Sequence, residues 1–158
     1  MGFDRQSIGF AVMRIFIGLF FVGEGINKLP WFSDSSILPR IFSRWVATVP
    51  PGSFSRWYLD HIAIPGQSVL ASLVPFGELC VGVALLVGLW TPVVAGLAFF
   101  MCLNYNTASG AIVRPDILTN GNVLPVLGMT LGLAIGGANL PWRIRISLRR
   151  RAATTISQ

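Results

Sequence analysis

The hydrophobic pattern predicts four membrane-spanning helices, at about residues 8–30, 67–89, 92–108 and 122–138. The first stretch lacks the small-residue cleavage site of a signal peptide, so we interpret it as a retained span. Residues 69–103 are almost continuously apolar, and one crossing uses about 20 residues. We therefore expect two helices there, with a tight turn at residues 88–92, where Trp90 suits a membrane interface and Pro92 can open a helix.

The fourth predicted span begins after Asn122, which can cap a helix N-terminus. Its glycines recur at every fourth position, so one helix face is nearly bare backbone. This spacing is typical of close packing against a neighbouring helix. The predicted packing residues are Gly128, Gly132 and Gly136.

The long connection between the first two spans shows helical spacing of its own. Apolar side chains from Ile37 to Val49 recur at helical intervals, and residues 54–64 form a second amphipathic piece with Trp57 and Tyr58. We expect both pieces to lie on the membrane surface as a partial lid. The predicted fold is therefore all-α: a four-transmembrane-helix bundle in one domain, residues 1–142, with an amphipathic interfacial loop between helices 1 and 2.

Composition strengthens the membrane interpretation. Of the residues, 53% are hydrophobic and 11% are charged, whereas a soluble domain carries roughly 25% charged residues. Most of the net charge of +6 comes from arginines in a basic tail, residues 143–158. We interpret this tail as an anchor at anionic lipid headgroups rather than as a nucleic-acid surface. An even number of spans puts both termini on the same side of the membrane, and the basic tail indicates that this side is the cytoplasm. We therefore expect an inner-membrane protein with both termini in the cytoplasm.

The sequence offers no redox centre or metal site of its own. Cys80 and Cys102 lie separately inside apolar runs without a CxxC motif, and His61 has no neighbouring ligand residue. No metal and no intrinsic cofactor are therefore expected.

Four ionisable residues fall inside the predicted spans, where burial is costly unless the group is paired or hydrated. Three of them share one face of the first helix, namely Arg14, Glu24 and Lys28. The spacing predicts that Lys28 pairs with Glu24, one turn away, and that Arg14 reaches Glu78 in the second span. Two interpretations stay open: structural ion pairs that fix helix register, or a polar site that receives a ligand headgroup or relays protons.

Neutral polar residues near the outer ends of spans three and four could join the same site. Taken alone, Asn104 and Asn122 would each cap a helix or form a hydrogen bond between helices. Aromatic side chains could line an apolar slot for a quinone ring or isoprenoid tail, or simply pack and face lipid; these are Phe20, Phe21, Phe76, Phe99 and Phe100. The candidate ligand site consists of Arg14, Glu24, Lys28, Glu78, Asn104, Tyr105 and Asn122.

Three stretches of the sequence, residues 14–29, 77–91 and 101–106, resemble the DoxX family of small bacterial and archaeal membrane proteins. That family is also similar to the DoxD subunit of thiosulfate:quinone oxidoreductase. The resemblance implies a four-helix membrane bundle and identifies Arg14, Lys28 and Glu78 with the polar motif residues. Pro92 stands where family members commonly have a basic residue.

Three functional hypotheses follow. The first is a membrane subunit of a quinone-linked redox complex that holds a quinone headgroup in the bundle, with the redox centre elsewhere. The second is a non-catalytic accessory subunit of a respiratory or photosynthetic assembly, which binds lipids and other membrane-protein subunits or a second copy of itself. A transporter is the third, although four spans give little room for a pathway and no inverted repeat is evident.

Overall fold

The computed structural model describes residues 4–119 and 122–143, and within these ranges the chain forms helices and no strands. The all-α prediction is therefore confirmed for the described chain. The predicted tail lies outside the described residues except for Arg143. The helices are α1 (Arg5–Asn27), η1 (Leu29–Phe32), α2 (Ile37–Thr48), α3 (Phe54–Tyr58), η2 (Leu59–Ala63), α4 (Gln67–Val87), α5 (Thr91–Ala108), η3 (Ala111–Val113), η4 (Pro115–Leu118) and α6 (Val123–Gly136).

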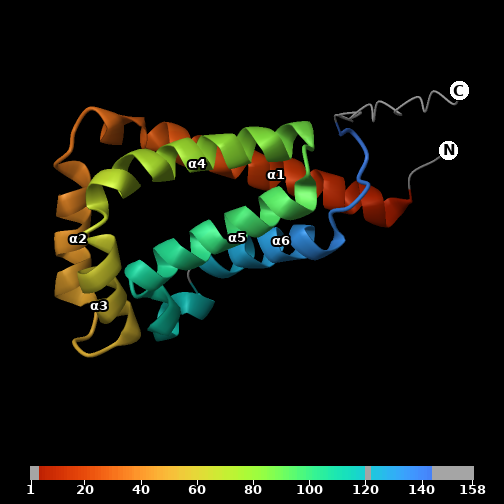
Figure 1. The fold of residues 1–158 in the computed structure, drawn as a ribbon. Helices are drawn as coiled ribbons and strands as arrows, with labels where there is room; N and C mark the ends of the chain where they lie inside the picture. The colour runs from red at the N-terminus through yellow and green to blue at the C-terminus, as the bar shows by residue number, and fades with distance from the viewer. Residues whose placement is uncertain (1–3, 120–121, 144–158) are drawn as a thin grey trace, which may run out of the picture.

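Four long helices pack together, and two short ones cross one end of them. Helix α1 packs mainly against α4, α5 packs mainly against α6, and the turn between α4 and α5 joins the two pairs. Figure 1 shows α2 and α3 across one end of the four helices. The first residues of α1 and the segment after α6 both lie at the opposite end, which we call the Arg14 end after the buried arginine near it.

Two of the helices, α1 and α4, are long and apolar enough to cross a membrane. Helix α6 is apolar but has 14 residues, which spans about 21 Å. That α5 and α6 also cross the membrane therefore stays a prediction. Large apolar side chains point outward from all four helices, as a lipid environment requires; they include Phe16, Leu19, Val69, Phe76, Phe100 and Ile135.

The closest helix contact lies between α1 and α4, where glycines let the two backbones meet. A Cβ atom added at Gly82 would lie 2.7 Å from the Val22 nitrogen and 2.9 Å from the Gly18 carbonyl oxygen. One further turn along, Gly25 faces Leu79 at a similar distance. These contacts fix the antiparallel register of the two helices, so residues near 78 on α4 lie beside residues near 26 on α1.

The predicted glycine face of α6 packs against little in the described chain. No heavy atom lies within 4 Å of an added Cβ at Gly128 or Gly132, whereas Gly136 faces the ring of Phe10. The close approach within this chain is therefore made by glycines of α1 and α4 instead. Packing of Gly128 and Gly132 against another subunit stays a prediction.

The turns and the interfacial loop follow the sequence closely. Helix α4 ends at Val87, Gly88 adopts a left-handed conformation with φ of 71°, and α5 begins at Thr91, as predicted for residues 88–92. Helices α2, α3 and η2 match the two predicted amphipathic pieces. Their apolar sides form a second small core beside the main bundle, made by Leu38, Phe42, Leu59 and Ala63.

Candidate functional site

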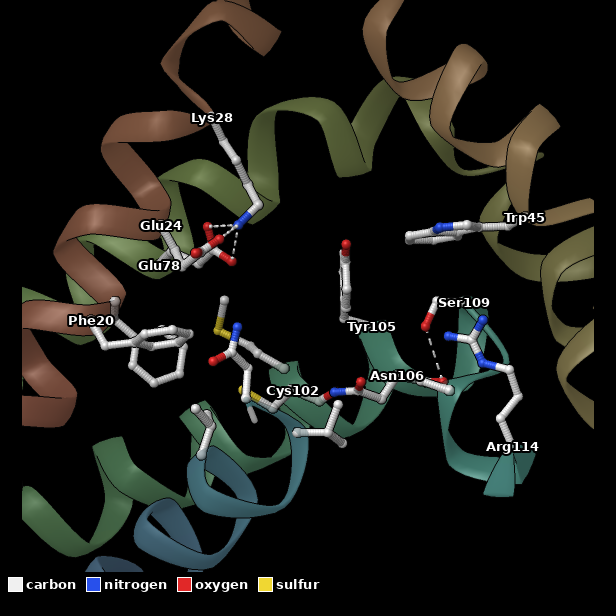
Figure 2. Close-up of a pocket in the computed structure, with 16 residues that line it drawn as sticks. Phe20, Glu24, Lys28, Trp45, Glu78, Cys102, Tyr105, Asn106, Ser109 and Arg114 are labelled. Carbon is white, nitrogen blue, oxygen red and sulfur yellow. Dashed lines mark hydrogen bonds and ion pairs between the residues drawn. The ribbon is translucent and has the colours of Figure 1, made fainter. Parts of the chain in front are cut away.

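A cavity of about 370 Å³ lies between the long helices, close to the α2–α3 end of the molecule. Helices α1 and α5 contribute most of its lining residues, and Glu78 of α4, Trp45 of α2, η3 and the start of α6 complete it. Figure 2 shows the side chains that converge on this space. The lining residues are Phe20, Phe21, Glu24, Lys28, Trp45, Glu78, Met101, Cys102, Tyr105, Asn106, Ser109, Ala111, Arg114, Asn122, Val123 and Val126.

One side of the cavity carries three charged side chains that bind one another. These are Glu24, Lys28 and Glu78, which we call the Lys28 cluster. The Lys28 ammonium donates to Glu24 Oε2 and to both carboxylate oxygens of Glu78, each at 2.8 Å. The side chains of Lys28 and Glu78 are each 12% exposed, whereas that of Glu24 is 40% exposed. With both carboxylates ionised, the cluster carries one net negative charge. All three protons of the ammonium are donated within the cluster, so none is left for a ligand. Glu24 binds Lys28 through Oε2 alone, so its Oε1 does not contact Lys28.

Local helix geometry explains how this cluster forms. Glu24 and Lys28 are four residues apart on α1, so their side chains lie on the same face. Glu78 comes from α4, and the glycine contacts between α1 and α4 bring it to the level of Lys28. Lys28 caps the C-terminus of α1, and its backbone N–H donates to the Glu24 carbonyl. The polar end of the cavity is thus set by the closest helix packing in the fold.

Aromatic side chains form another wall of the cavity. The rings of Trp45 and Tyr105 meet edge to face, with centroids 5.0 Å apart and planes at 87°. The described chain offers no hydrogen bond to the Tyr105 hydroxyl, so this group is free to bind a ligand. Next along α5, Asn106 is buried and donates to the Cys102 carbonyl at 2.7 Å. The Tyr105 hydroxyl therefore keeps its donor for a ligand, and Asn106 keeps the second hydrogen of its amide.

A second cation lies across the cavity from the Lys28 cluster. Figure 2 shows Arg114 beside Ser109, on the far side of Tyr105 from Lys28. Arg114 follows η3 in the connection between α5 and α6, and both Arg114 and Asn122 contact other groups of the protein. The cavity therefore has the Lys28 cluster on one side and Arg114 on the other, with Tyr105 between them (Figure 2).

Five of the seven predicted ligand residues line the cavity and two do not. Glu24, Lys28, Glu78, Tyr105 and Asn122 line it. The Asn104 amide donates instead to the Tyr58 hydroxyl and ties α5 to α3. The remaining predicted residue, Arg14, is fully buried elsewhere.

The predicted pair between Arg14 and Glu78 is wrong. Both oxygens of Glu78 bind Lys28, and Arg14 Nη2 donates to the Trp142 carbonyl at 2.8 Å. The α1–α4 register explains the difference, because it places Arg14 beside Gly88, ten positions along α4 from Glu78. The predicted local pair between Lys28 and Glu24 is confirmed.

Several lining residues were not predicted as part of the site. Trp45 lies in the predicted interfacial loop and Arg114 lies between the third and fourth predicted spans, and periodicity does not say where such a connection returns to the bundle. Of the aromatic residues proposed for a slot, Phe20 and Phe21 line the cavity, whereas Phe76 and Phe100 point outward with more than half of their surface exposed. Met101 and Cys102 lie on α5 and Ser109 caps its C-terminus, and their residue types alone do not indicate a ligand site.

The cavity offers binding and proton-exchanging groups. Among residues 4–119 and 122–143, no three His, Cys, Asp or Glu side chains come together as metal ligands would. Cys80 and Cys102 are free thiols. Carboxylates, a phenol, amides and aromatic rings are the functional groups that this arrangement presents to a ligand.

Comparison with known proteins decides the family. The DoxX family model matches residues 9–108, well over half of the chain. The chain belongs to the DoxX family. It is accordingly a membrane protein, and the matched region contains the whole Lys28 cluster and Tyr105 but neither Arg114 nor Asn122. No curated protein and no solved structure matches the chain.

Proposed function

We propose that this DoxX protein binds the headgroup of a quinone in its cavity, as a membrane subunit associated with a quinone-linked redox complex. The observation that carries the proposal is the combination of one free phenol donor, Tyr105, with an aromatic wall and a carboxylate cluster around a single cavity. Its volume of about 370 Å³ falls within the range of roughly 300–1,000 Å³ common for small-molecule sites. Membrane helices around it suit a ligand with an isoprenoid tail.

The lining residues fit a quinone ring in chemical terms. A ring carbonyl needs a hydrogen-bond donor, and the Tyr105 hydroxyl has no partner in the described chain. The ring itself is flat and apolar, and it can pack against Trp45 and Phe20, both of which line the cavity. Met101, Val123 and Val126 provide apolar contacts on the remaining sides.

A quinone supplies two-electron chemistry coupled to the uptake of two protons. Within this chain, Tyr105 would bind and orient the carbonyl oxygen through its O–H. Glu24 is the more exposed acid of the Lys28 cluster, and its Oε1 is not bound to Lys28, so this oxygen can take up and release a proton. Glu78, held by both oxygens, would keep Lys28 in position. Electrons would come from a partner protein.

Purification from native membranes tests this function. The full chain, isolated in mild detergent, should carry a quinone detectable by extraction and mass spectrometry, together with a redox subunit. Protein that contains no quinone and is not stabilised by an added short-chain quinone would rule out the binding proposal. A quinone bound without any redox partner would rule out the association with a complex.

An accessory role is the second candidate, and one observation favours it. Around the open Gly128 and Gly132 positions, α6 exposes Leu131 and Ile135 without a partner in the described chain. Small residues flanked by large apolar ones suit a neighbouring membrane helix. If Gly132→Leu abolishes co-purification of a partner while quinone content is unchanged, the accessory role is supported.

We also propose that the protein lies in the inner membrane with both termini in the cytoplasm. The start of α1 and the end of α6 lie at the same end of the bundle, which supports termini on one side (Figure 1). Reporter fusions at each terminus test the side, since an alkaline phosphatase fusion is active only outside the cytoplasm. Phosphatase activity at either terminus would contradict this orientation.

A further inference from the structure

The guanidinium of Arg14 is buried but only partly bonded. Arg14 is 0% exposed, and Nη2 donates to the Trp142 carbonyl at 2.8 Å. Its other nitrogens, Nε and Nη1, are buried without a hydrogen-bond partner. Because a buried cation is costly unless it is paired and hydrogen-bonded, these two donors indicate a missing acceptor.

No carboxylate of the described chain supplies that acceptor. Asp4 caps α1 by accepting from the Ser7 backbone N–H, and Asp34 and Asp60 bind arginines of the interfacial loop. Glu24 and Glu78 both bind Lys28. Every described acidic side chain is thus engaged elsewhere, so the acceptor for Arg14 comes from outside these residues.

The backbone around Arg14 is shaped to accept this side chain. Gly88 has φ of 71°, and a Cβ atom there would collide with Arg14 Nη1. Only glycine leaves room for the guanidinium against the turn between α4 and α5. On the other side, the segment after α6 runs past α1 (Figure 1) and contributes the Trp142 carbonyl. The guanidinium therefore lies between the α4–α5 turn and the segment after α6.

The depth of Arg14 corresponds to the edge of a bilayer. Arg14 and Lys28 are fourteen positions apart on α1, about 21 Å along the helix axis, while the hydrocarbon core is about 30 Å thick. At the Arg14 end, Trp90 and Trp142 are 66% and 61% exposed. Tryptophan is enriched at the headgroup level, so these side chains indicate that Arg14 lies just inside the lipid phosphates.

We propose that Arg14 binds the phosphate of an anionic phospholipid, whose non-bridging oxygens accept hydrogen bonds from Nε and Nη1. Phosphate offers several acceptor oxygens to one guanidinium, which suits donors that lie on different edges of the group. The site is distinct from the cavity and does not depend on the proposed binding of quinone. It would fix the lipid between the α4–α5 turn and the segment after α6.

Lipid titration of the full chain tests the proposal. The probe is phosphatidylglycerol added to protein in zwitterionic detergent, with phosphatidylcholine as the neutral control. Wild-type protein should bind phosphatidylglycerol saturably and melt at a higher temperature with it than with phosphatidylcholine. Salt screens contacts between exposed charges strongly and those of a buried group much less, so lipid binding at Arg14 should persist at high salt.

Substitutions locate the effect. Arg14→Gln should weaken phosphatidylglycerol binding about tenfold or more, since a charge-assisted contact is lost. Arg5→Gln is the matched control on the same helix, exposed at the same end, and should bind like wild type. If Arg14→Gln fails to fold, Arg14→Lys keeps the charge with one donor nitrogen, and it should bind several-fold more weakly than wild type.

Three results would overturn the proposal. Equal stabilisation of the wild type by phosphatidylglycerol and phosphatidylcholine would mean that the protein does not select an anionic phospholipid. Unchanged binding in the Arg14 variants would place the lipid elsewhere, for example on the basic tail. Inorganic phosphate that stabilises the protein as well as the lipid does would assign the site to a free anion. None of these results bears on quinone in the cavity.

Discussion

The Lys28 ammonium lies 2.8 Å from both carboxylate oxygens of Glu78, a residue fifty positions away in the chain. The same nitrogen also binds Glu24, so one cation holds two carboxylates and joins α1 to α4. This contact is the polar anchor of the cavity. Its loss would affect both the packing of the two helices and the charge around a ligand.

Lys28→Met keeps an unbranched side chain of similar length but removes its charge. Two carboxylates then remain without their cation, and we expect the free energy of unfolding to fall by about 2–5 kcal/mol. Thermal or denaturant unfolding in detergent measures the change. Arg40→Met is the control, because the Arg40–Asp34 pair is exposed and should contribute no more than about 1 kcal/mol. Equal losses in the two variants would contradict a special role for Lys28.

A double-mutant cycle distinguishes the observed ion pair from the one that the sequence predicted. Lys28→Met combined with Glu78→Gln should show a coupling energy of about 1–3 kcal/mol, since the two side chains touch. Arg14→Gln combined with Glu78→Gln should be additive within about 0.5 kcal/mol, because the two side chains lie far apart. Strong coupling of Arg14 to Glu78 would show that the α1–α4 register is wrong.

Gly82→Ala tests the close contact between α1 and α4. The added methyl group would meet the Val22 backbone nitrogen at 2.7 Å, and overpacking of this kind costs about 1–3 kcal/mol. Gly128→Ala on α6 is the matched helical control, since nothing lies within 4 Å of the added atom. It should be neutral or stabilise by up to about 1 kcal/mol through helix propensity. Equal shifts of the unfolding midpoint in Gly82→Ala and Gly128→Ala would contradict this difference between the two glycines.

The sequence predicted the elements that depend on local pattern. Apolar runs and the helical repeat of about 3.6 residues predicted the long helices and the amphipathic pieces of the loop. Glycine and proline predicted the turn near Gly88. One-turn spacing was also enough to predict the pair between Glu24 and Lys28. These features arise within one helix or one turn, so no information on tertiary contacts is needed.

Contacts between helices were harder to predict, because they depend on how far one helix slides along another. The sequence paired Arg14 with Glu78, whereas the contact of Gly82 with Gly18 and Val22 places Glu78 nearer the C-terminal end of α1. Trp45 and Arg114 were missed as lining residues for a related reason. Both come from connections whose path back to the bundle follows from tertiary packing alone.

The most direct test of the proposed function is the dissociation constant of a short-chain quinone for three forms of the full chain. Tyr105→Phe removes the free hydroxyl in the cavity and should weaken binding about 2–10-fold relative to wild type. Tyr58→Phe removes the hydroxyl that binds Asn104, outside the cavity, and should leave quinone affinity unchanged. Absence of saturable binding to the wild type, or equal affinities of Tyr105→Phe and Tyr58→Phe, would contradict quinone binding at this site.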